Sequence, residues 1–445
     1  MCQLMLRTFI SAMTTIPKRV PIPRNGVDYR GKIVLAPMVR SGELPSRLLA
    51  LKYGADLVWG PETVDKSMIG TIKKINPITS TINFTRYPSN ASRTQPVEQK
   101  ESLIYRIHPT RERRKLIFQI GTSSPTFAVE AAKLVAADVA GIDVNAGCPK
   151  PFSTSGGMGA ALLQTPDLLA SILTALVKEV GAVYEIGISV KIRLLETPER
   201  TEALVRKLCD TGITGLTIHC RTTPMRPRER AIREQLRMIA DICRETGVAC
   251  LMNGDVKNKD EALELIQEFG VDGAMIATAA EANSSCFRTQ AEGGLLPWRE
   301  VVHEYVKTAL EVDNKWGNTK YLLGQLVPGK AEVYRKVTSS KGYTEMCEIL
   351  ELQDLLDQAR EVDERLGLGV NYKGAVKKAK TKNKSAQAAG GSMGKAMAHG
   401  NESKKPLSER GVTATTAKDM GGSYDVECQD PRMEQGISAS SVLAV

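Results

Sequence analysis

The sequence predicts an α/β protein, a (β/α)8 TIM barrel with a C-terminal helical domain and a disordered tail. Short apolar runs typical of buried strands alternate with amphipathic helical patterns. Eight such units occupy about 250 residues, the usual size of a parallel barrel. Polar side chains follow many of the expected strands, as in a barrel. A doubly wound open sheet is the competing fold, and the absence of a GxGxxG turn after the first strand disfavours it.

Strands and helices are predicted from the spacing of apolar residues and from the Gly and Pro residues at their ends. β-branched runs bounded by Gly or Pro predict strands at 32–36, 56–59, 115–120, 141–145, 188–192, 215–219, 248–252 and 273–277. Apolar spacing of 3.6, with Pro or Gly near the ends, predicts helices at 46–54, 126–137, 167–180, 198–211, 232–246 and 259–269. A polar, basic insertion at 85–114 interrupts this alternation.

The composition divides the chain into four expected parts. Residues 1–30 form a flexible arm that is basic at first, and 31–294 form the barrel. Residues 295–370 form a helical domain, in which the apolar spacing fits either a packing helix or an RNA-contacting one. Residues 371–445 form a Lys-rich tail too poor in apolar residues to fold alone, which serves as a tRNA-binding, nuclear-localisation or merely solvated segment.

The charge and the cysteines limit the function classes. The chain of 445 residues has 60 Lys and Arg against 50 Asp and Glu, a net charge of +10, which favours a polyanionic partner. Nine Cys without CxxC pairs and four His indicate neither a disulfide framework nor a zinc site, so we expect free thiols in a reducing compartment. No apolar run reaches the roughly 20 residues of a membrane span. We expect a cytoplasmic monomer without metal, with the nucleus as a further location and mitochondrial import disfavoured by prolines in the arm.

The stretch GIDVNAGCPKPFSTSGGMGAALL carries the strongest chemical signal. Its strand delivers Asn145 and then Cys148 into a loop of Pro, Ser and Gly, before a helix with Thr165 as N-cap and Pro166 at its first position. A thiol just past a strand's carboxyl end lies where α/β folds keep their chemistry. The alternative is a small buried Cys in a Gly-rich turn.

Polar residues at the other expected strand ends form a constellation with Cys148. Each alone has an ordinary explanation, such as a snorkelling Lys, a core His or a type I′ turn at Asn253-Gly254. Together they meet at one barrel mouth: Pro37, Met38, Gln119, Asn145, Cys148, Lys191, Arg193, His219, Arg221, Asn253, Gly254, Asp255, Ala277 and Thr278. A buried cation can stabilise an electron-rich ring, amides can bond a heterocycle, and the late Gly turn suits a phosphate, so FMN fits.

Six motifs in order resemble the tRNA-dihydrouridine synthases, which reduce uridine in tRNA with FMN and NAD(P)H. They are LAPMVRSGELPSRLLALKYGADLVW, FQIGTS, GIDVNAGCPKPFSTSGGMGAALL, VKIRLL, IHCRT and NGDV, and the resemblance spans about 31–323. GCPKPFSTSGGMGAALL and DNKWGNTKYLLGQ resemble the eukaryotic subfamily that modifies position 20 of the D-loop.

The resemblance implies a role for each matching residue. Cys148 is the acid that protonates C5 of uridine, and its thiol must be protonated at rest. Asn145 and Arg193 face the target base. FMN lies against Ala36, Pro37, Met38, Gln119, Lys191, His219, Asn253, Gly254, Asp255, Ala277 and Thr278.

Two positions depart from the family pattern. Many members have Gly-Arg or Ala-Arg where this chain has Ala277-Thr278, so an Arg for the FMN phosphate is missing unless another basic residue compensates. Cys220 stands where Gly is common. Two other functions therefore stay open, an FMN barrel that reduces a free pyrimidine or small enone, and a non-catalytic RNA-binding protein with a vestigial pocket.

Overall fold

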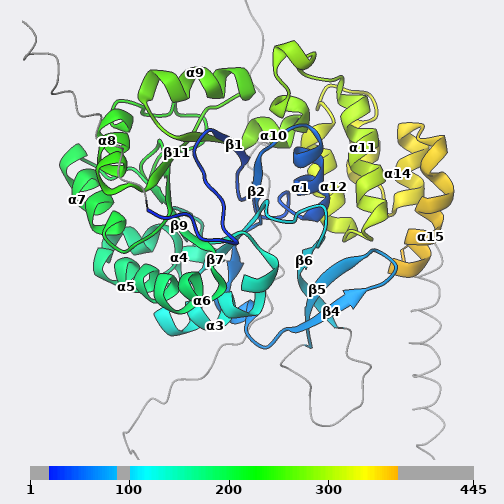
Figure 1. Cartoon of the computed structure of the whole chain (residues 1–445). Coiled ribbons are helices and arrows are strands. Elements are labelled where there is room, and N and C mark those ends of the chain that lie inside the picture. The colour runs from blue at the N-terminus through cyan, green and yellow to red at the C-terminus, as the bar shows by residue number, and fades with distance from the viewer. Residues whose placement is uncertain (1–19, 88–100, 369–445) are drawn as a thin grey trace, which may run out of the picture. The chain divides into compact units, whose positions relative to one another are not determined.

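The computed structural model describes residues 20–87 and 101–368, which belong to one compact unit (Figure 1). Its centre is a closed barrel of eight parallel strands, in which each strand pairs with the next, β12 with β1, and β2 with β7. The strands are β1 (Lys32–Leu35), β2 (Leu57–Trp59), β7 (Leu116–Gly121), β8 (Gly141–Ala146), β9 (Gly187–Arg193), β10 (Gly215–His219), β11 (Ala249–Asn253) and β12 (Gly273–Ile276). The predicted TIM barrel is confirmed.

Helices cover the outside of the barrel (Figure 1). They are α1 (Leu44–Lys52), α3 (Pro125–Val135), α5 (Pro166–Leu176), α6 (Ala182–Tyr184), α7 (Pro198–Cys209), α8 (Leu236–Thr246), α9 (Lys259–Phe269) and α10 (Thr278–Ala282). The longer ones bury mainly apolar residues, as α5 and α8 do, since the 3.6 spacing directs Leu and Ile onto the strands.

One helix start and one helix cap differ from the prediction. α8 begins at Leu236 rather than at 232, because the Ile232 backbone N–H donates to Cys220 O at 2.7 Å and holds this segment to the end of β10. α5 begins at Pro166 after Thr165, as expected, but the Thr165 side chain makes no capping hydrogen bond.

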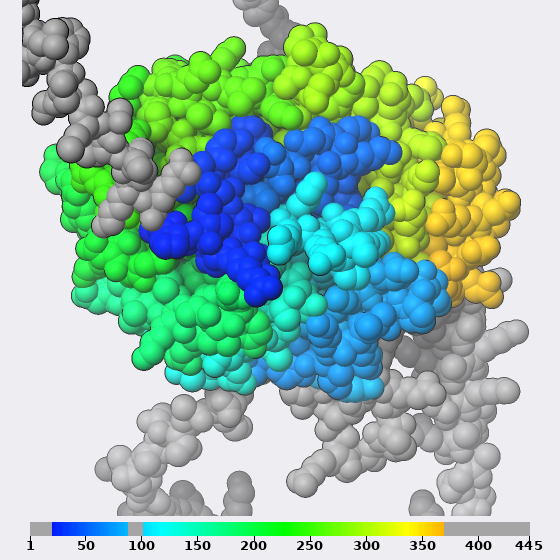
Figure 2. Space-filling model, viewed as in Figure 1, coloured from blue at the N-terminus to red at the C-terminus, as the bar shows by residue number. Residues whose placement is uncertain are grey.

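Residues 20–31 run across the amino ends of the strands and close that end of the barrel, which we call the bottom. Figure 2 shows this segment in the darkest blue over that face. Val20 N donates to Gly247 O at 2.9 Å and Gly31 N to Asp272 O at 2.7 Å. Residues 1–19 of the expected arm lie outside the described residues.

Tyr29 inserts its buried ring into this end of the barrel and stacks 5.8 Å from Trp59. The Tyr29 side chain explains why several strands begin with Gly. A Cβ on Gly215 would lie 2.6 Å from Tyr29 Cδ2, and a Cβ on Gly141 would lie 3.0 Å from Tyr29 Oη. The strand-opening glycines therefore provide space for one aromatic plug.

The alternation of strands and helices is interrupted directly after β2, earlier than the expected insertion at 85–114. After β3 (Thr63–Val64) and α2 (Asp65–Met68), an antiparallel sheet forms from β4 (Ile72–Asn76), β5 (Thr81–Arg86) and β6 (Ser102–Ile107). β4 is exposed along nearly its whole length, so its sequence has no buried-strand pattern to predict it. Residues 88–100 of the insertion lie outside the described residues.

Helices follow the barrel, as expected for this part of the chain. They are α11 (Trp298–Glu311), α12 (Trp316–Leu326), α13 (Tyr334–Ser339), α14 (Tyr343–Leu350) and α15 (Leu356–Leu366), and α11 packs against α1 (Figure 1). The apolar stripe of α11 is buried: Val301, Val302, Tyr305, Val306 and Leu310. That stripe therefore packs in the core. The expected boundary at 294/295 stays a prediction, and the tail 371–445 lies outside the described residues.

None of the helices in the described ranges is both long and apolar enough to cross a membrane. The same residues contain no group of three or more His, Cys, Asp or Glu side chains placed to hold a metal ion.

Candidate active site

The strand register brings the predicted polar residues to the carboxyl end of the barrel. Asn145 is paired with Lys191 across β8 and β9. His219 is paired with Arg193 on one side and with Asn253 on the other. These residues are spread over positions 145 to 253 of the sequence, and the barrel places them on adjacent strands.

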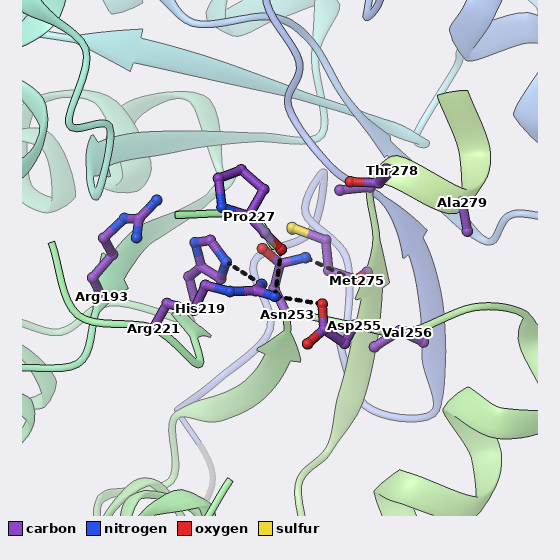
Figure 3. A pocket seen from close by; sticks show the side chains of 12 residues that line it. Arg193, His219, Arg221, Pro227, Asn253, Asp255, Val256, Met275, Thr278 and Ala279 are labelled. Carbon is purple, nitrogen blue, oxygen red and sulfur yellow. Dashed lines mark hydrogen bonds and ion pairs between the residues drawn. The ribbon is translucent and has the colours of Figure 1, made fainter. Parts of the chain in front are cut away.

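A cavity of about 160 Å³ opens beside β10, β11 and β12 (Figure 3). It is smaller than the roughly 300–1,000 Å³ of typical small-molecule pockets, so it can take one end of a nucleotide cofactor. Eight residues of the expected constellation line it: Arg193, His219, Arg221, Asn253, Gly254, Asp255, Ala277 and Thr278. The other predicted residues lie outside its lining, on β1, β7, β8, β9 and the loops that follow: Ala36, Pro37, Met38, Gln119, Asn145, Cys148 and Lys191.

Arg221 fixes the floor of this cavity (Figure 3). Its Nη2 lies 2.5 Å from Asp255 Oδ1, and its Nε donates to Glu229 O at 2.7 Å. The Asp255 carboxylate also accepts from Ala231 N at 2.7 Å. Asp255 thus organises the surrounding loops as well as lining the cavity.

The site is electropositive. Burial, with Arg193 nearby, lowers the pKa of Lys191 to about 8. Burial and the charges of Lys191, Arg193 and Arg221 lower the pKa of His219 to about 2, so its imidazole is neutral at physiological pH and can only exchange hydrogen bonds. Among the described residues, Asp143 is the carboxyl group whose charge acts on Lys191, and it only partly opposes the effect of burial. A buried cation whose charge is not fully compensated favours an anionic ligand.

A buried carboxyl group that the sequence analysis did not single out lies beneath this cluster. Asp143 on β8 is inaccessible to solvent, and it accepts from Gln119 Nε2 at 2.8 Å and from Ser189 Oγ at 2.7 Å. Burial raises its pKa to about 6, opposed by these two hydrogen bonds and by the charge of Lys191. The signal was present, since Asp143 is the one charged residue in the apolar strand GIDVN.

The loop after β8 is held at several backbone points. Asn145 Oδ1 accepts from Gly147 N at 3.0 Å and from Cys148 N at 3.1 Å, and Arg193 Nε donates to Gly147 O at 2.7 Å. Ala160 N donates to Cys148 O at 2.9 Å. Asn145 and Arg193 therefore fix the position of Cys148, in addition to any contact with a substrate.

Cys148 differs from the other cysteines of the described chain. It is partly exposed, whereas Cys209, Cys220, Cys243, Cys250, Cys286 and Cys347 are buried. Burial and the nearby Glu62 carboxylate raise the pKa of the Cys148 thiol, so it is protonated at neutral pH. Cys148 is therefore available as an acid, in contrast to the buried thiol in a Gly-rich turn that was the alternative.

Cys220, the second unusual thiol, is enclosed by protein. It is fully buried, and burial raises its pKa to about 12. It packs in the core behind Gly254, where an added Cβ would lie 3.4 Å from Cys220 Cβ.

Two exposed phenylalanines follow strands at the same end of the barrel as Cys148. Phe127 lies in the first turn of α3, just after β7, and Phe152 lies in α4 (Pro151–Thr154), four residues after Cys148. Lys66 Nζ is 5.6 Å from the centre of the Phe127 ring, and exposed Lys150 precedes α4. Aromatic rings next to cations are typical of surfaces that bind unpaired nucleic-acid bases.

The dihydrouridine synthase family pattern matches residues 34–364. A Schizosaccharomyces pombe protein named tRNA-dihydrouridine(20) synthase (NAD(P)+) is 50% identical over 332 residues, 74% of this chain and 66%, just under two thirds, of that protein. A Saccharomyces cerevisiae protein of the same name is 45% identical over 330 residues, 73% of this chain and 84% of that protein. The S. pombe tRNA-dihydrouridine(16/17) synthase is 29% identical over 271 residues, 59% of this chain and 60% of that protein.

Proposed function

Because this chain belongs to the dihydrouridine synthase family, we propose that it reduces uridine to 5,6-dihydrouridine in tRNA, at position 20 of the D-loop. NADPH or NADH is the reductant and FMN the cofactor. The observation that supports the chemistry most directly is the partly exposed, protonated thiol of Cys148, held beside the electropositive mouth of the barrel.

The residues at the mouth fit an anionic, phosphorylated cofactor. Lys191 is a buried cation whose lowered pKa shows that Asp143 does not fully compensate its burial, and a bound anion would stabilise its charge further. Asn253 Nδ2 donates to Met275 O at 2.9 Å, which leaves its side-chain oxygen to accept from a cofactor hydroxyl. The cavity lined by Gly254, Ala277 and Thr278 is of a size for the phosphate end.

FMN, when bound, supplies hydride to C6 of the uracil ring. The chain supplies the proton: the Cys148 S–H donates to C5, and the raised pKa of the thiol keeps that proton in place until it is needed. Lys191 stabilises negative charge on the reduced cofactor. Gln119, with its amide nitrogen bonded to Asp143, presents its oxygen as an acceptor.

The target base must leave the folded tRNA to reach the barrel mouth, at a cost of a few kcal/mol. Stacking on an aromatic ring contributes about 1–3 kcal/mol per base, so Phe127 and Phe152 can offset this cost. Lys66 lies near the Phe127 ring, and Lys150 is exposed two positions before Phe152, so both can contact the phosphates.

The first experiment is dihydrouridine mapping on total tRNA from cells with and without this protein. Loss at position 20 alone supports the proposal. An unchanged map would contradict it and redirect attention to free pyrimidines or other small enones.

A variant pair tests the acid. Cys148→Ala should bind FMN and be reduced by NADPH at the wild-type rate, but should lose most dihydrouridine formation. Cys220→Ala is the matched control, because that thiol is buried and should be dispensable for the proton transfer. Full tRNA turnover by Cys148→Ala would refute the assignment.

A further inference from the structure

Glu62 lies beside the reactive loop, the loop after β8 that carries Cys148. The residue is partly exposed, and the proposed function gives it no role. It lies between β2 and β3, and its Oε1 accepts from Ser153 Oγ at 2.8 Å. Its Oε2 is buried and receives no well-formed hydrogen bond from the described residues. At Gly121 a Cβ would lie 2.5 Å from Glu62 Oε1, so the absence of a side chain there makes room for the carboxyl group.

Residues of the reactive loop lie around the Glu62 carboxyl group. Ser153 lies in α4, five residues after Cys148, and a Cβ on Gly159 would lie 2.4 Å from Ser153 Oγ and 2.6 Å from Cys148 O. The Cys148 thiol and the Asn145 amide both lie close enough to Glu62 to interact with its carboxyl group. Glu62 and Cys148 are therefore neighbours at the loop after β8.

If Glu62 only anchored α4, its hydrogen bond with Ser153 would be explained but its second, buried carboxyl oxygen would not. An anchor for α4 needs the bond from Ser153 to Oε1 and nothing more. Leaving a second carboxyl oxygen buried without a good donor costs about 1–3 kcal/mol, and a glutamine could serve the same anchor without a charge. The Cys148 thiol must give up a proton in each catalytic cycle, and a carboxylic acid beside it can replace that proton.

On the basis of the proposed function, we propose that Glu62 is the proton-transfer partner of Cys148, and that it returns a proton to the sulfur after each turnover. The neighbouring Asn145 and Ser153 hold the two groups together.

The proton balance is simple and involves no electron transfer. The Cys148 S–H bond breaks as its proton goes to C5 of the substrate, which leaves a thiolate. The Glu62 carboxylic acid then gives its proton to the sulfur, so the O–H bond breaks and the S–H bond reforms. The resulting carboxylate regains a proton from water after the product leaves.

The electrostatics of the pair support this direction. Burial raises the pKa of Glu62, so the acid form persists to higher pH than for an exposed glutamate. Burial and the Glu62 charge raise the pKa of Cys148, while Arg193 opposes the shift. Lys191 is the other charged group that interacts with the thiol. A thiolate formed here is therefore a strong base beside an acid.

The decisive variant is Glu62→Gln, which keeps the shape and an acceptor for Ser153 but removes the acidic proton and the charge. In the FMN-loaded protein without tRNA, we expect iodoacetamide to alkylate Cys148 several-fold faster at pH 9, where Glu62 of the wild type is ionised, because loss of that negative charge lowers the thiol pKa. Mass spectrometry of the Cys148 peptide measures this rate independently of activity.

Turnover provides the second measurement. With reduced enzyme at pH 6.5, Glu62→Gln should form the first dihydrouridine at the wild-type rate, and the steady-state rate should fall at least tenfold. Acetate or another small carboxylic acid should restore part of the steady-state rate. Glu62→Asp keeps a carboxyl group and should retain more turnover than Glu62→Gln, and thermal melting with FMN titration checks that each variant folds.

Glu281→Gln is the matched control. Glu281 is likewise a partly exposed glutamate whose pKa burial raises and which accepts from a serine, Ser41, but no hydrogen bond or charge interaction joins it to Cys148. It should leave the alkylation profile unchanged.

The outcomes separate the two proposals. A wild-type protein that makes no dihydrouridine overturns the proposed function. An active wild-type protein with a Glu62→Gln variant of identical alkylation and steady-state rates overturns this inference alone. An equal loss in the first turnover and in the steady state would also overturn it, since that pattern reports misplacement of Cys148.

Discussion

The side-chain amide of Gln119 donates to Asp143 Oδ2 at 2.8 Å, and this bond sets which end of the amide remains for a ligand. In Asp143→Asn, the residue no longer presents two acceptor oxygens, so the Gln119 amide loses its fixed orientation. We expect FMN to bind about tenfold more weakly, a loss of about 1.4 kcal/mol. Fluorescence titration of the apo-protein with FMN measures this. Ser189→Ala, which keeps the Gln119 bond, should have a smaller effect; equal losses would show that orientation of Gln119 is unimportant.

We expect the buried Lys191 to lower the free energy of unfolding of the apo-protein. Its folded pKa of about 8 lies below the usual 10.5, so the buried ammonium destabilises the apo-protein at pH 7 by on the order of 3 kcal/mol. Lys191→Met should therefore raise the Tm of the apo-protein while it weakens FMN binding. The linkage also predicts that wild-type stability rises with pH between about 8 and 10.5, where the unfolded chain alone binds the proton, and that Lys191→Met lacks this rise. A lower Tm in Lys191→Met would contradict the argument.

The plug at the bottom of the barrel predicts coupling between Gly215 and Tyr29. Gly215→Ala places a Cβ 2.6 Å from Tyr29 Cδ2, and such overpacking should destabilise the fold by about 1–3 kcal/mol. Tyr29→Ala should cost about 3–5 kcal/mol through the cavity that it leaves. In the double variant the clash is absent, so urea unfolding should show clear non-additivity. Simple addition of the two effects would mean that the ring is not the obstacle.

Thr278 tests the location of the cofactor phosphate. It lines the cavity at the position where the family resemblance leads us to expect an Arg. Thr278→Arg should tighten FMN binding severalfold, because an added guanidinium can bond a phosphate in a bidentate manner, and the gain should shrink at high salt. The same titration checks it, with riboflavin as the control ligand, for which no gain is expected. An equal gain for riboflavin would place the phosphate elsewhere.

Phe152 tests the path of the RNA. Its ring is 48% exposed, so truncation should leave folding intact. Phe152→Ala should raise the KM for tRNA about tenfold through lost base stacking, with little change in flavin reduction by NADPH. Leu263→Ala, a comparably exposed apolar residue on α9, is the control and should leave the KM unchanged. A KM unaffected by Phe152→Ala would exclude stacking on this ring.

The sequence predicted the barrel because each parallel strand carries its own signal. Runs such as GIDVN and GLTIH are apolar, bounded by Gly and followed by polar residues, and each of the eight strands was expected within a residue or two of its place. β4 escaped prediction because an exposed strand at the edge of a small sheet has no core to impose a pattern. The start of α8 was predicted too early, because hydrogen bonds to the neighbouring strand ends compete with the helix there.

By itself the sequence determined which residues stand at the strand ends, since periodicity and turn residues act locally along the chain. It also carried the motifs of the family. Only the tertiary structure decided that Asp143 fixes Gln119, that Tyr29 fills the space beside the strand-opening glycines, and that Glu62 lies against Cys148 from 86 positions earlier in the chain. Burial, charge and hydrogen-bond geometry arise between segments that are distant in sequence, so no local pattern encodes them.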